Sequence, residues 1–335
     1  MLMNKFSVFI PTYNAAQRIE KCLISIRQQE YPADKVEIVV VDGGSTDGTR
    51  AIAGEFGATV LDNPKKLAHF AFSEFAAQAT GDLVIMFAAD NELGVPNWLS
   101  MANTAFERYR DMSALWGRQV AAPQDPPANH YYELIQNDPL SFFVNRNLDF
   151  YKRYGSIFEV EGSTGWLFRV EAGRPLVWGA NGLVLRWELA KPFFLKSFAG
   201  DNDVFQGVIE SGHNLVGYLP GMKIIHHHIR SVAEWAGKLK RNFHRHFLSH
   251  YEERNMGWIL DKTFRRRLLL WIIYAGVPFF SGFDAVVRSV RDRNACWLYH
   301  PVFNMVQLTV YSWLMLSTRE GRSYLKKSLL RTFGP

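Results

Sequence analysis

The sequence is poor in cysteine, and this scarcity excludes two classes of protein. Its 335 residues contain two cysteines, Cys22 and Cys296, which lie far apart and form no C-x-x-C pattern. Neither a disulfide framework nor a cysteine metal site is expected from such a distribution. A reducing, cytosolic environment fits the chain best.

Two glycine motifs that bind phosphate are also missing. No G-x-G-x-x-G follows the first predicted strand, where Pro11, Tyr13 and Asn14 stand instead. No G-x-x-x-x-G-K-[ST] loop occurs either. The sequence therefore disfavours nicotinamide or flavin dehydrogenases and P-loop ATPases.

Long uncharged stretches are confined to two late segments, residues 268–283 and 294–318. The first is shorter than the ~20 apolar residues that a spanning helix needs and contains Pro278, and the second includes several polar residues. Basic residues precede the first segment and follow the second, so positive charge would bracket the pair on one side of a membrane. The pattern predicts a membrane hairpin or an interfacial pair, with two buried helices of a helical subdomain as the alternative.

The charge balance is basic. Thirty-eight Lys and Arg residues against 32 Asp and Glu give a formal net charge of +6. This sign suits an anionic partner such as phosphate, nucleic acid or an acidic lipid surface. The basic residues cluster around the apolar segments and no nucleic-acid-binding motif is present, so a lipid surface is expected and nucleic acid is not.

The first ~120 residues alternate between short β-branched runs and helical patterns, as α/β proteins do. Strands are predicted at residues 6–10, 36–41, 58–61 and 83–87, and helices at residues 15–29, 67–79 and 96–109. This alternation predicts an α/β fold with a mostly parallel sheet and helices on both faces. The proline-rich residues 121–128 interrupt it and lead into a less regular second half.

Polar side chains follow three of the predicted strands. They are Pro11-Thr12-Tyr13-Asn14, the loop from Asp42 to Gly48, and Ala88-Ala89-Asp90-Asn91-Glu92. Open α/β sheets bind ligands outside the carboxyl ends of their strands, so these three loops are expected to converge on one site. Helix capping by Ser45 or Thr46 is the simpler alternative for a single loop.

Together with their strands, these loops resemble glycosyltransferase family 2. Residues 8–14 read V-F-I-P-T-Y-N and residues 38–49 read I-V-V-V-D-G-G-S-T-D-G-T, while Gly81-Asp82, Asp90-Asn91 and P-N-W-L at 96–99 surround the later strand. The resemblance covers roughly residues 5–230. It implies the GT-A fold, which is Rossmann-like, and an inverting transfer of a sugar from a nucleotide-sugar donor.

The resemblance also implies roles for individual residues. Pro11, Thr12, Tyr13 and Asn14 would line the nucleotide pocket, and Asp42 would accept hydrogen bonds from the base. Asp90 would hold Mg²⁺ or Mn²⁺, which hard carboxylate oxygens suit. The position of the first aspartate of the family's D-x-D motif is occupied by Ala88, so a metal-independent or degenerate site is the alternative.

Three more candidates come from the later part of the resemblance. Asp201 aligns with the family's catalytic base, although Gly200 replaces the acid expected before it. Asn181 lies in a glycine loop that resembles the one beneath the sugar. Of the three consecutive histidines that begin at His226, His226 is the expected second metal ligand. A solvated turn at 200–203 and an exposed histidine loop are the alternatives.

These inferences predict two parts: a GT-A catalytic domain at residues 1–230 and an amphipathic, apolar, helical, membrane-associated region at 231–335. Apolar Trp235, Leu239, Phe243 and Phe247 recur at helical spacing among basic residues, which predicts a helix at a membrane surface or packed on the domain. The expected enzyme transfers a sugar from a UDP- or GDP-sugar to a lipid-linked or saccharide acceptor, at the cytoplasmic membrane face. A catalytically silent scaffold that binds sugar nucleotides is the alternative.

Overall fold

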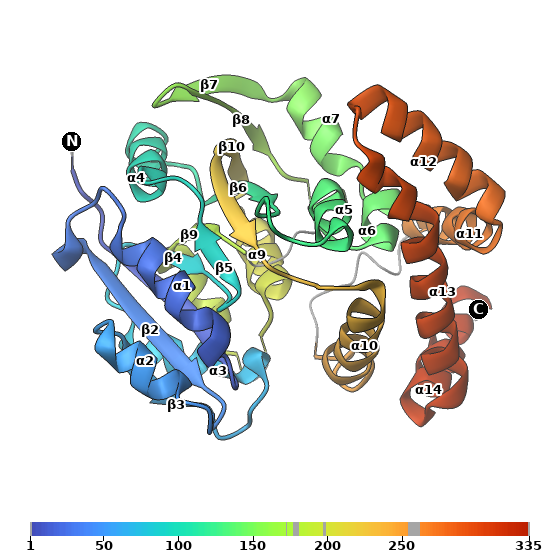
Figure 1. Ribbon diagram of the computed structural model, residues 1–335, viewed down its shortest axis with the longest axis horizontal. Coiled ribbons are helices and arrows are strands. Elements are labelled where there is room, and N and C mark those ends of the chain that lie inside the picture. Colours follow the sequence, from blue (N-terminus) through green and yellow to red (C-terminus); the bar gives the residue numbers. More distant parts are fainter. Residues whose placement is uncertain (1, 172, 177–180, 197–198, 254–261, 334–335) are drawn as a thin grey trace. The chain divides into compact units, whose positions relative to one another are not determined.

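The computed structural model describes residues 2–171, 173–176, 181–196, 199–253 and 262–333 (Figure 1). The chain divides into two compact units, the first formed by Met1–Val120 and Asn147–His227 and the second by Ala121–Arg146 and His228–Pro335. The sequence predicted a division between residues 230 and 231. The structure differs because residues 121–146 form helices whose apolar side chains pack with the C-terminal helices.

One sheet forms the centre of the first unit. Its strands lie in the order β3-β2-β1-β4-β9-β6-β10-β8-β7, and β5 pairs with β10. Their bounds are β1 Phe6–Thr12, β2 Val36–Asp42, β3 Thr59–Asp62, β4 Leu83–Met86, β5 Asn91–Leu93, β6 Ala114–Val120, β7 Ser156–Val160, β8 Ser163–Arg169, β9 Leu183–Arg186 and β10 Leu215–His226. The four strands predicted from the sequence are β1 to β4.

The sheet is mixed, which corrects the expectation of a mostly parallel one. Strands β1 to β4 pair in parallel, and so do β6 and β10. By contrast, β9 runs antiparallel between β4 and β6, and β10 pairs antiparallel with β5 and β8. The βαβ alternation that implies parallel pairing covers only the first ~120 residues, and every antiparallel pair includes one of β7 to β10, which come from the irregular second half.

Helices cover both faces of the sheet. On one face α1 (Ala16–Arg27), α2 (Thr49–Glu55) and α4 (Trp98–Arg108) pack their apolar side chains on Val8, Ile10 and Val40. On the other face α3 (Ala71–Gln78), α8 (Trp187–Phe194) and α9 (Asp201–Glu210) pack on Phe9 and Val39. Alternate strand residues point to opposite faces, so near-continuous apolar strands serve both cores. The first unit also contains α7 (Asn147–Tyr154).

The second unit is helical. Its helices are α5 Pro127–Ile135, α6 Pro139–Val144, α10 Val232–Asn242, η3 Phe243–Leu248, α11 Lys262–Gly276, α12 Pro278–Asp292, η5 Ala295–Tyr299, α13 His300–Ser317 and α14 Arg319–Phe333. Trp235 and Leu239 of α10 are buried with Tyr131 and Phe303, whereas Lys240 and Arg241 are exposed. The amphipathic helix predicted from Val232 therefore buries its apolar face within this unit.

No single helix of the described residues is long and apolar enough to cross a membrane. Helices α11 and α12 reach that length and apolarity only together, as a pair bent by 88°.

A buried polar network joins the helices of the second unit around His300. The hydroxyl groups of Tyr131 and Tyr274 lie 2.7 Å from Nδ1 and 2.8 Å from Nε2 of this histidine. Tyr274 in turn donates to Asp284 Oδ2 at 2.8 Å, and Arg288 binds the same oxygen. Burial lowers the pKa of His300 to about 4, outweighing the opposing effect of Asp284. The neutral imidazole is therefore the form that the folded chain holds.

This shift predicts a pH-dependent stability. The unfolded chain protonates His300 below pH ~6.5 whereas the folded chain does not until about pH 4, so the free energy of unfolding falls as the pH drops through this window. The loss from this residue reaches up to about 3 kcal/mol. Urea denaturation between pH 7 and pH 4 measures it, with His300→Gln expected to flatten the profile and the exposed His213→Gln expected to leave it unchanged.

Candidate active site

The three polar loops predicted from the sequence meet at one edge of the sheet. Strands β2, β1 and β4 are parallel neighbours, with Thr12 opposite Asp42 and Phe9 opposite Met86. The residues after these strands therefore emerge side by side. Asn181 joins them, because Gly182 N donates to Met86 O at 2.9 Å where β9 begins beside the end of β4.

The loops after β1 and β2 are tied to each other by side-chain hydrogen bonds. Asn14 N donates to Ser45 Oγ at 2.7 Å, and Thr46 N donates to Asn14 Oδ1 at 3.0 Å. Ala15 N and Ala16 N donate to Thr49 Oγ1 and Asp47 Oδ2. Asn14 adopts φ 49°, a left-handed conformation that asparagine tolerates better than most residues. The polar sequence of both loops thus builds one rigid surface.

Asp42 lies beneath this surface, with only 1% of the residue exposed. Its Oδ1 accepts hydrogen bonds from the hydroxyls of Thr12 (2.9 Å) and Ser45 (2.5 Å), and its Oδ2 accepts from Gly44 N (3.1 Å) and Ser45 N (2.8 Å). Burial alone would raise the pKa of Asp42, but the bonds from Ser45, Thr12 and Arg50 together hold it below the usual value. The carboxylate therefore organises the loop, and its contact with a nucleotide base stays a prediction.

Replacing this carboxylate should destabilise the chain. Asp42→Ala leaves the donors of Thr12, Gly44 and Ser45 without their acceptor, and we expect a loss of about 2 to 3 kcal/mol in the free energy of unfolding. Urea denaturation measures the change, with the exposed Asp34→Ala as the control. Because the folded pKa of Asp42 is depressed, the wild-type advantage over the Ala variant should be full near neutral pH and shrink as the pH falls through that pKa. Equal free energies of unfolding for Asp42→Ala and Asp34→Ala would contradict this account.

The strongest candidate for a metal site lies beside these loops. Asp90 Oδ1 and His226 Nε2 are 4.0 Å apart, and both side chains are largely buried. Asn181 Nδ2 lies 3.3 Å from His226 Nε2, while Asn91 Nδ2 donates to Asn181 Oδ1 at 2.8 Å. The antiparallel pairing of β5 with β10 places Asn91 opposite His226. The predicted residues Asp90, Asn181 and His226 are therefore brought together.

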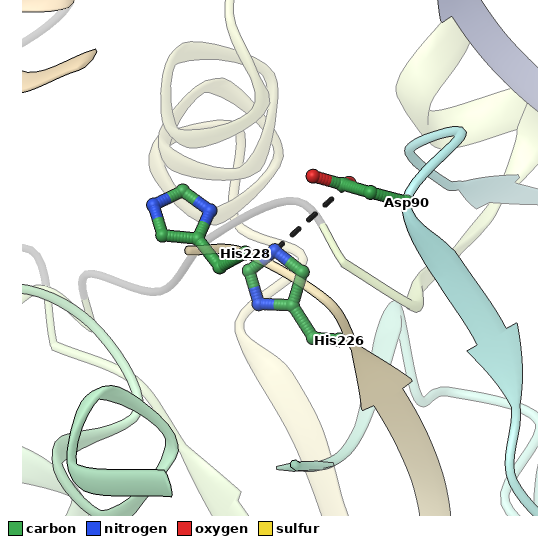
Figure 2. A group of neighbouring side chains, drawn as sticks. All are labelled: Asp90, His226 and His228. Carbon is green, nitrogen blue, oxygen red and sulfur yellow. Dashed lines mark ion pairs between the residues drawn. The ribbon is translucent and has the colours of Figure 1, made fainter. Parts of the chain in front are cut away.

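His228, two residues further along the chain, also turns a ring nitrogen toward this group (Figure 2). One ligand atom from each of Asp90, His226 and His228 lies within 4.8 Å of the others. Adjacent His227 faces away and bonds Glu92 Oε1 at 2.8 Å. This alternation follows from the extended backbone at the end of β10, where successive side chains point to opposite faces.

The donor set fits a divalent cation. Two ligands of one Mg²⁺ ion lie at most about 4.2 Å apart, twice the usual metal–oxygen distance. The Asp90–His226 separation satisfies this limit, and carboxylate and imidazole are both competent ligands. Arg18 Nη1 also contacts Asp90 Oδ2 at 3.3 Å, so a positive charge lies beside the carboxylate. Arg18 was not predicted from the sequence, because its partner lies 72 residues away in the chain.

Asp201 begins α9, on the first unit's second helical layer. The segment before it is held by the bond from Ala199 N to His69 O at 3.1 Å, and the placement of Asp201 beside Asp90 and His226 stays a prediction. A carboxylate in the first turn of a helix is stabilised by the helix dipole.

Tyr13, in the loop after β1, is 57% exposed, so its ring is accessible to a flat ligand.

Comparison with known sequences identifies relatives. The sequence model of glycosyl transferase family 2 matches residues 7–171. The glycosyltransferase AglE of Haloferax volcanii is 53% identical over 57 residues, which are 17% of this chain and 18% of that protein. A protein of Methanococcus voltae, named dolichyl N-acetyl-alpha-D-glucosaminyl phosphate 3-beta-D-2,3-diacetamido-2,3-dideoxy-beta-D-glucuronosyltransferase, is 36% identical over 94 residues, 26% of this chain and 29% of that one. The matches thus span less than a third of either relative.

Comparison with solved structures concerns the fold. The mannosyltransferase PcManGT of Pyrobaculum calidifontis, solved with GDP-Man and Mn²⁺, superposes with a TM-score of 0.54 at 16% identity. The superposition covers 93% of this chain and 88% of that one. The mixed α/β sheet is therefore of the GT-A-like type. The match to the family model places residues 7–171 in glycosyl transferase family 2.

Proposed function

We propose that this chain is an inverting enzyme that moves a sugar from a UDP- or GDP-linked donor to an acceptor hydroxyl or phosphate. The observation that carries the proposal is the pairing of the Asp90 carboxylate with the His226 imidazole at the carboxyl edge of the sheet. The GDP-Man and Mn²⁺ bound by the structural neighbour support a nucleotide-sugar donor. The transferase names of the relatives favour turnover over the silent scaffold.

Asp90 and His226 would hold Mg²⁺ or Mn²⁺. The cation, when bound, supplies the positive charge that neutralises a leaving diphosphate. Arg18 lies 3.3 Å from Asp90 and would add a positive charge for the leaving diphosphate, but it does not replace the metal ligand missing at Ala88. Pro11, Thr12, Tyr13 and Asn14 would form the wall of the nucleotide pocket, in the loop that Ser45 and Thr46 hold in place.

Asp201 would act as the base. The oxygen of an acceptor hydroxyl bonds to the anomeric carbon of the donor as the bond from that carbon to the diphosphate oxygen breaks. The hydroxyl proton passes to the Asp201 carboxylate. Attack from the side opposite the leaving group inverts the anomeric centre. Asn181, bonded to Asn91 and close to His226, would orient the sugar between these groups.

The acceptor is proposed to be lipid-linked, and the chain to work at the cytoplasmic face of the cell membrane. The name of the Methanococcus voltae relative, which contains a dolichyl phosphate sugar, supports a lipid-linked acceptor. The exposed apolar side chains of the second unit support membrane attachment. A cytoplasmic location agrees with the scarcity of cysteine in the chain.

A donor panel tests the proposal. The full chain is incubated with individual UDP- and GDP-sugars, with and without Mg²⁺ or Mn²⁺, and with membrane lipid extract as acceptor. We expect one donor to be consumed with transfer of its sugar into the lipid fraction, more rapidly with a cation. Donor binding without any transfer or hydrolysis across the panel would instead support the silent scaffold.

A further inference from the structure

The bent helix pair of the second unit exposes bulky apolar side chains. On α12, Phe279, Phe283 and Val290 are 73%, 66% and 75% exposed. Phe280, Val286 and Val287 of the same helix are also exposed, as are Leu269, Leu270, Ile272 and Ile273 of α11. Soluble proteins rarely present so many large apolar side chains next to one another, and such surfaces mark contacts with a partner or a membrane.

The exposed residues of α12 form one stripe. Residues 279, 283, 286 and 290 recur at spacings of three and four, which places them on one helical face about 60° wide. Ser281 and Ala285, on the other side, are buried. Asp284 and Arg288 belong to the polar network around His300. The helix is thus already packed through its polar face, and its apolar face is the one left in solvent.

The first helix of the pair is oriented in the same manner. Trp271 and Ala275 of α11 are buried against Val144 and Tyr274 packs partly against them, while Leu269, Leu270, Ile272 and Ile273 are exposed. Trp271 is fixed further by the hydrogen bond from its indole Nε1 to Asn304 Oδ1 at 2.8 Å. Both arms of the bend are therefore anchored to the second unit by one side and present the other.

The charges at the ends of the pair are positive. Arg266 and Arg267 at the start of α11 and Arg293 after α12 have exposed side chains. The two acidic residues of α12 are each paired with an arginine, Asp284 with Arg288 at 2.8 Å and Asp292 with Arg291 at 2.6 Å. An apolar face bordered by arginines is complementary to anionic phospholipid, where each basic residue adds about 1 kcal/mol to binding.

We propose that α11 and α12 lie in the plane of a membrane, at the boundary between headgroups and acyl chains of one leaflet of anionic phospholipid, without crossing it. The inference rests on the membrane attachment proposed above and assigns it a surface. Each arm has 15 residues, about 22 Å of helix against a hydrocarbon core of about 30 Å. Crossing would also draw Asp284 and Arg288 into hydrocarbon, whereas in-plane binding leaves them within the protein.

Vesicle flotation tests the surface. The full chain is mixed with vesicles of phosphatidylcholine alone or of phosphatidylcholine with phosphatidylglycerol. We expect binding mainly to the anionic vesicles, and a partition coefficient at least about tenfold lower for the double variant Phe279→Glu/Phe283→Glu. Ile157→Glu, which places the same charge at a 68% exposed apolar site on β7, should bind as wild type. Equal binding of the double variant and the control would overturn the proposal.

Depth measurement tests the orientation. Single cysteines at 279, 283 and 290, in a chain with Cys22→Ala and Cys296→Ala, carry a fluorophore that spin-labelled lipids quench. In-plane binding predicts one shallow depth for all three positions. A difference near the ~16 Å length of helix between 279 and 290 would show crossing and overturn the proposal. The folded state of each labelled chain is checked by its far-ultraviolet dichroism.

A second copy of the chain is the competing occupant. If the apolar face joins two copies, the double variant becomes monomeric in detergent-free buffer while vesicle binding stays unchanged, and that result contradicts the proposal.

A transfer assay in detergent micelles distinguishes failure of the membrane surface from failure of the proposed reaction. A double variant that keeps its micellar activity but no longer floats supports the surface, whereas a wild-type chain that floats but transfers no sugar refutes the proposed function alone.

Discussion

Asp201→Asn should nearly abolish sugar transfer while leaving donor binding intact. The amide keeps the size of the side chain at the start of α9 but cannot take the proton of the acceptor hydroxyl. General base catalysis contributes about 10²- to 10⁴-fold to a rate, and we expect kcat to decrease by a factor in that range. Isothermal titration calorimetry with the nucleoside diphosphate should give an affinity within about twofold of the wild-type value, which would show that donor binding is unchanged.

The control for this variant is Glu210→Gln, which removes a carboxylate from the opposite, exposed end of the same helix. It should retain full transfer. A pH profile adds a second readout, because the rising limb of kcat/KM in the wild type reports the base and should vanish in the Asp201 variant. Full transfer activity in Asp201→Asn would remove this residue as the base.

Asp90→Asn should weaken the effect of divalent cations on donor binding. The substitution replaces a charged ligand by a neutral one 4.0 Å from His226 Nε2, and we expect the affinity for Mn²⁺ to fall by about 10- to 100-fold. Titration of a nucleoside diphosphate with and without Mn²⁺ measures the change, and Mn²⁺ paramagnetic relaxation measures cation binding directly.

Glu92→Gln is the matched control, because this carboxylate lies two residues away and is held by His227 on the other face of the chain. It should leave the Mn²⁺ effect unchanged. Ala88→Asp provides the converse test, since a second carboxylate near Asp90 should tighten cation binding. An unchanged Mn²⁺ effect in the Asp90 variant would exclude this residue as a ligand.

The first half of the fold could be predicted from sequence because its signals are local. Residues 36–41 are almost wholly β-branched and apolar, and the strand formed there is β2, one residue longer. Strand β9 was missed, although residues 183–185 are apolar, because only its place between β4 and β6 gives it partners. Strand β5, with three residues, is too short to show a period.

The candidate site could be predicted in part for the same reason. Thr12, Asp42 and Asp90 follow recognisable strands, so their convergence follows from parallel pairing alone. The internal hydrogen bonds of Asp42 could not be foreseen, because the side chains of Thr12 and Ser45 reach it only in the folded loop. The ion pair of Arg18 with Asp90 likewise depends on how α1 packs against the loop after β4.

The hydrogen bonds between the loops after β1 and β2 bear on the thermodynamics of recognition. Asn14, Ser45 and Thr46 already form hydrogen bonds with one another without a ligand. A nucleotide that binds here, as proposed, would therefore remove little conformational freedom from the backbone of these loops. Association at this wall should therefore cost little conformational entropy and proceed with a rate set by diffusion and charge rather than by loop closure.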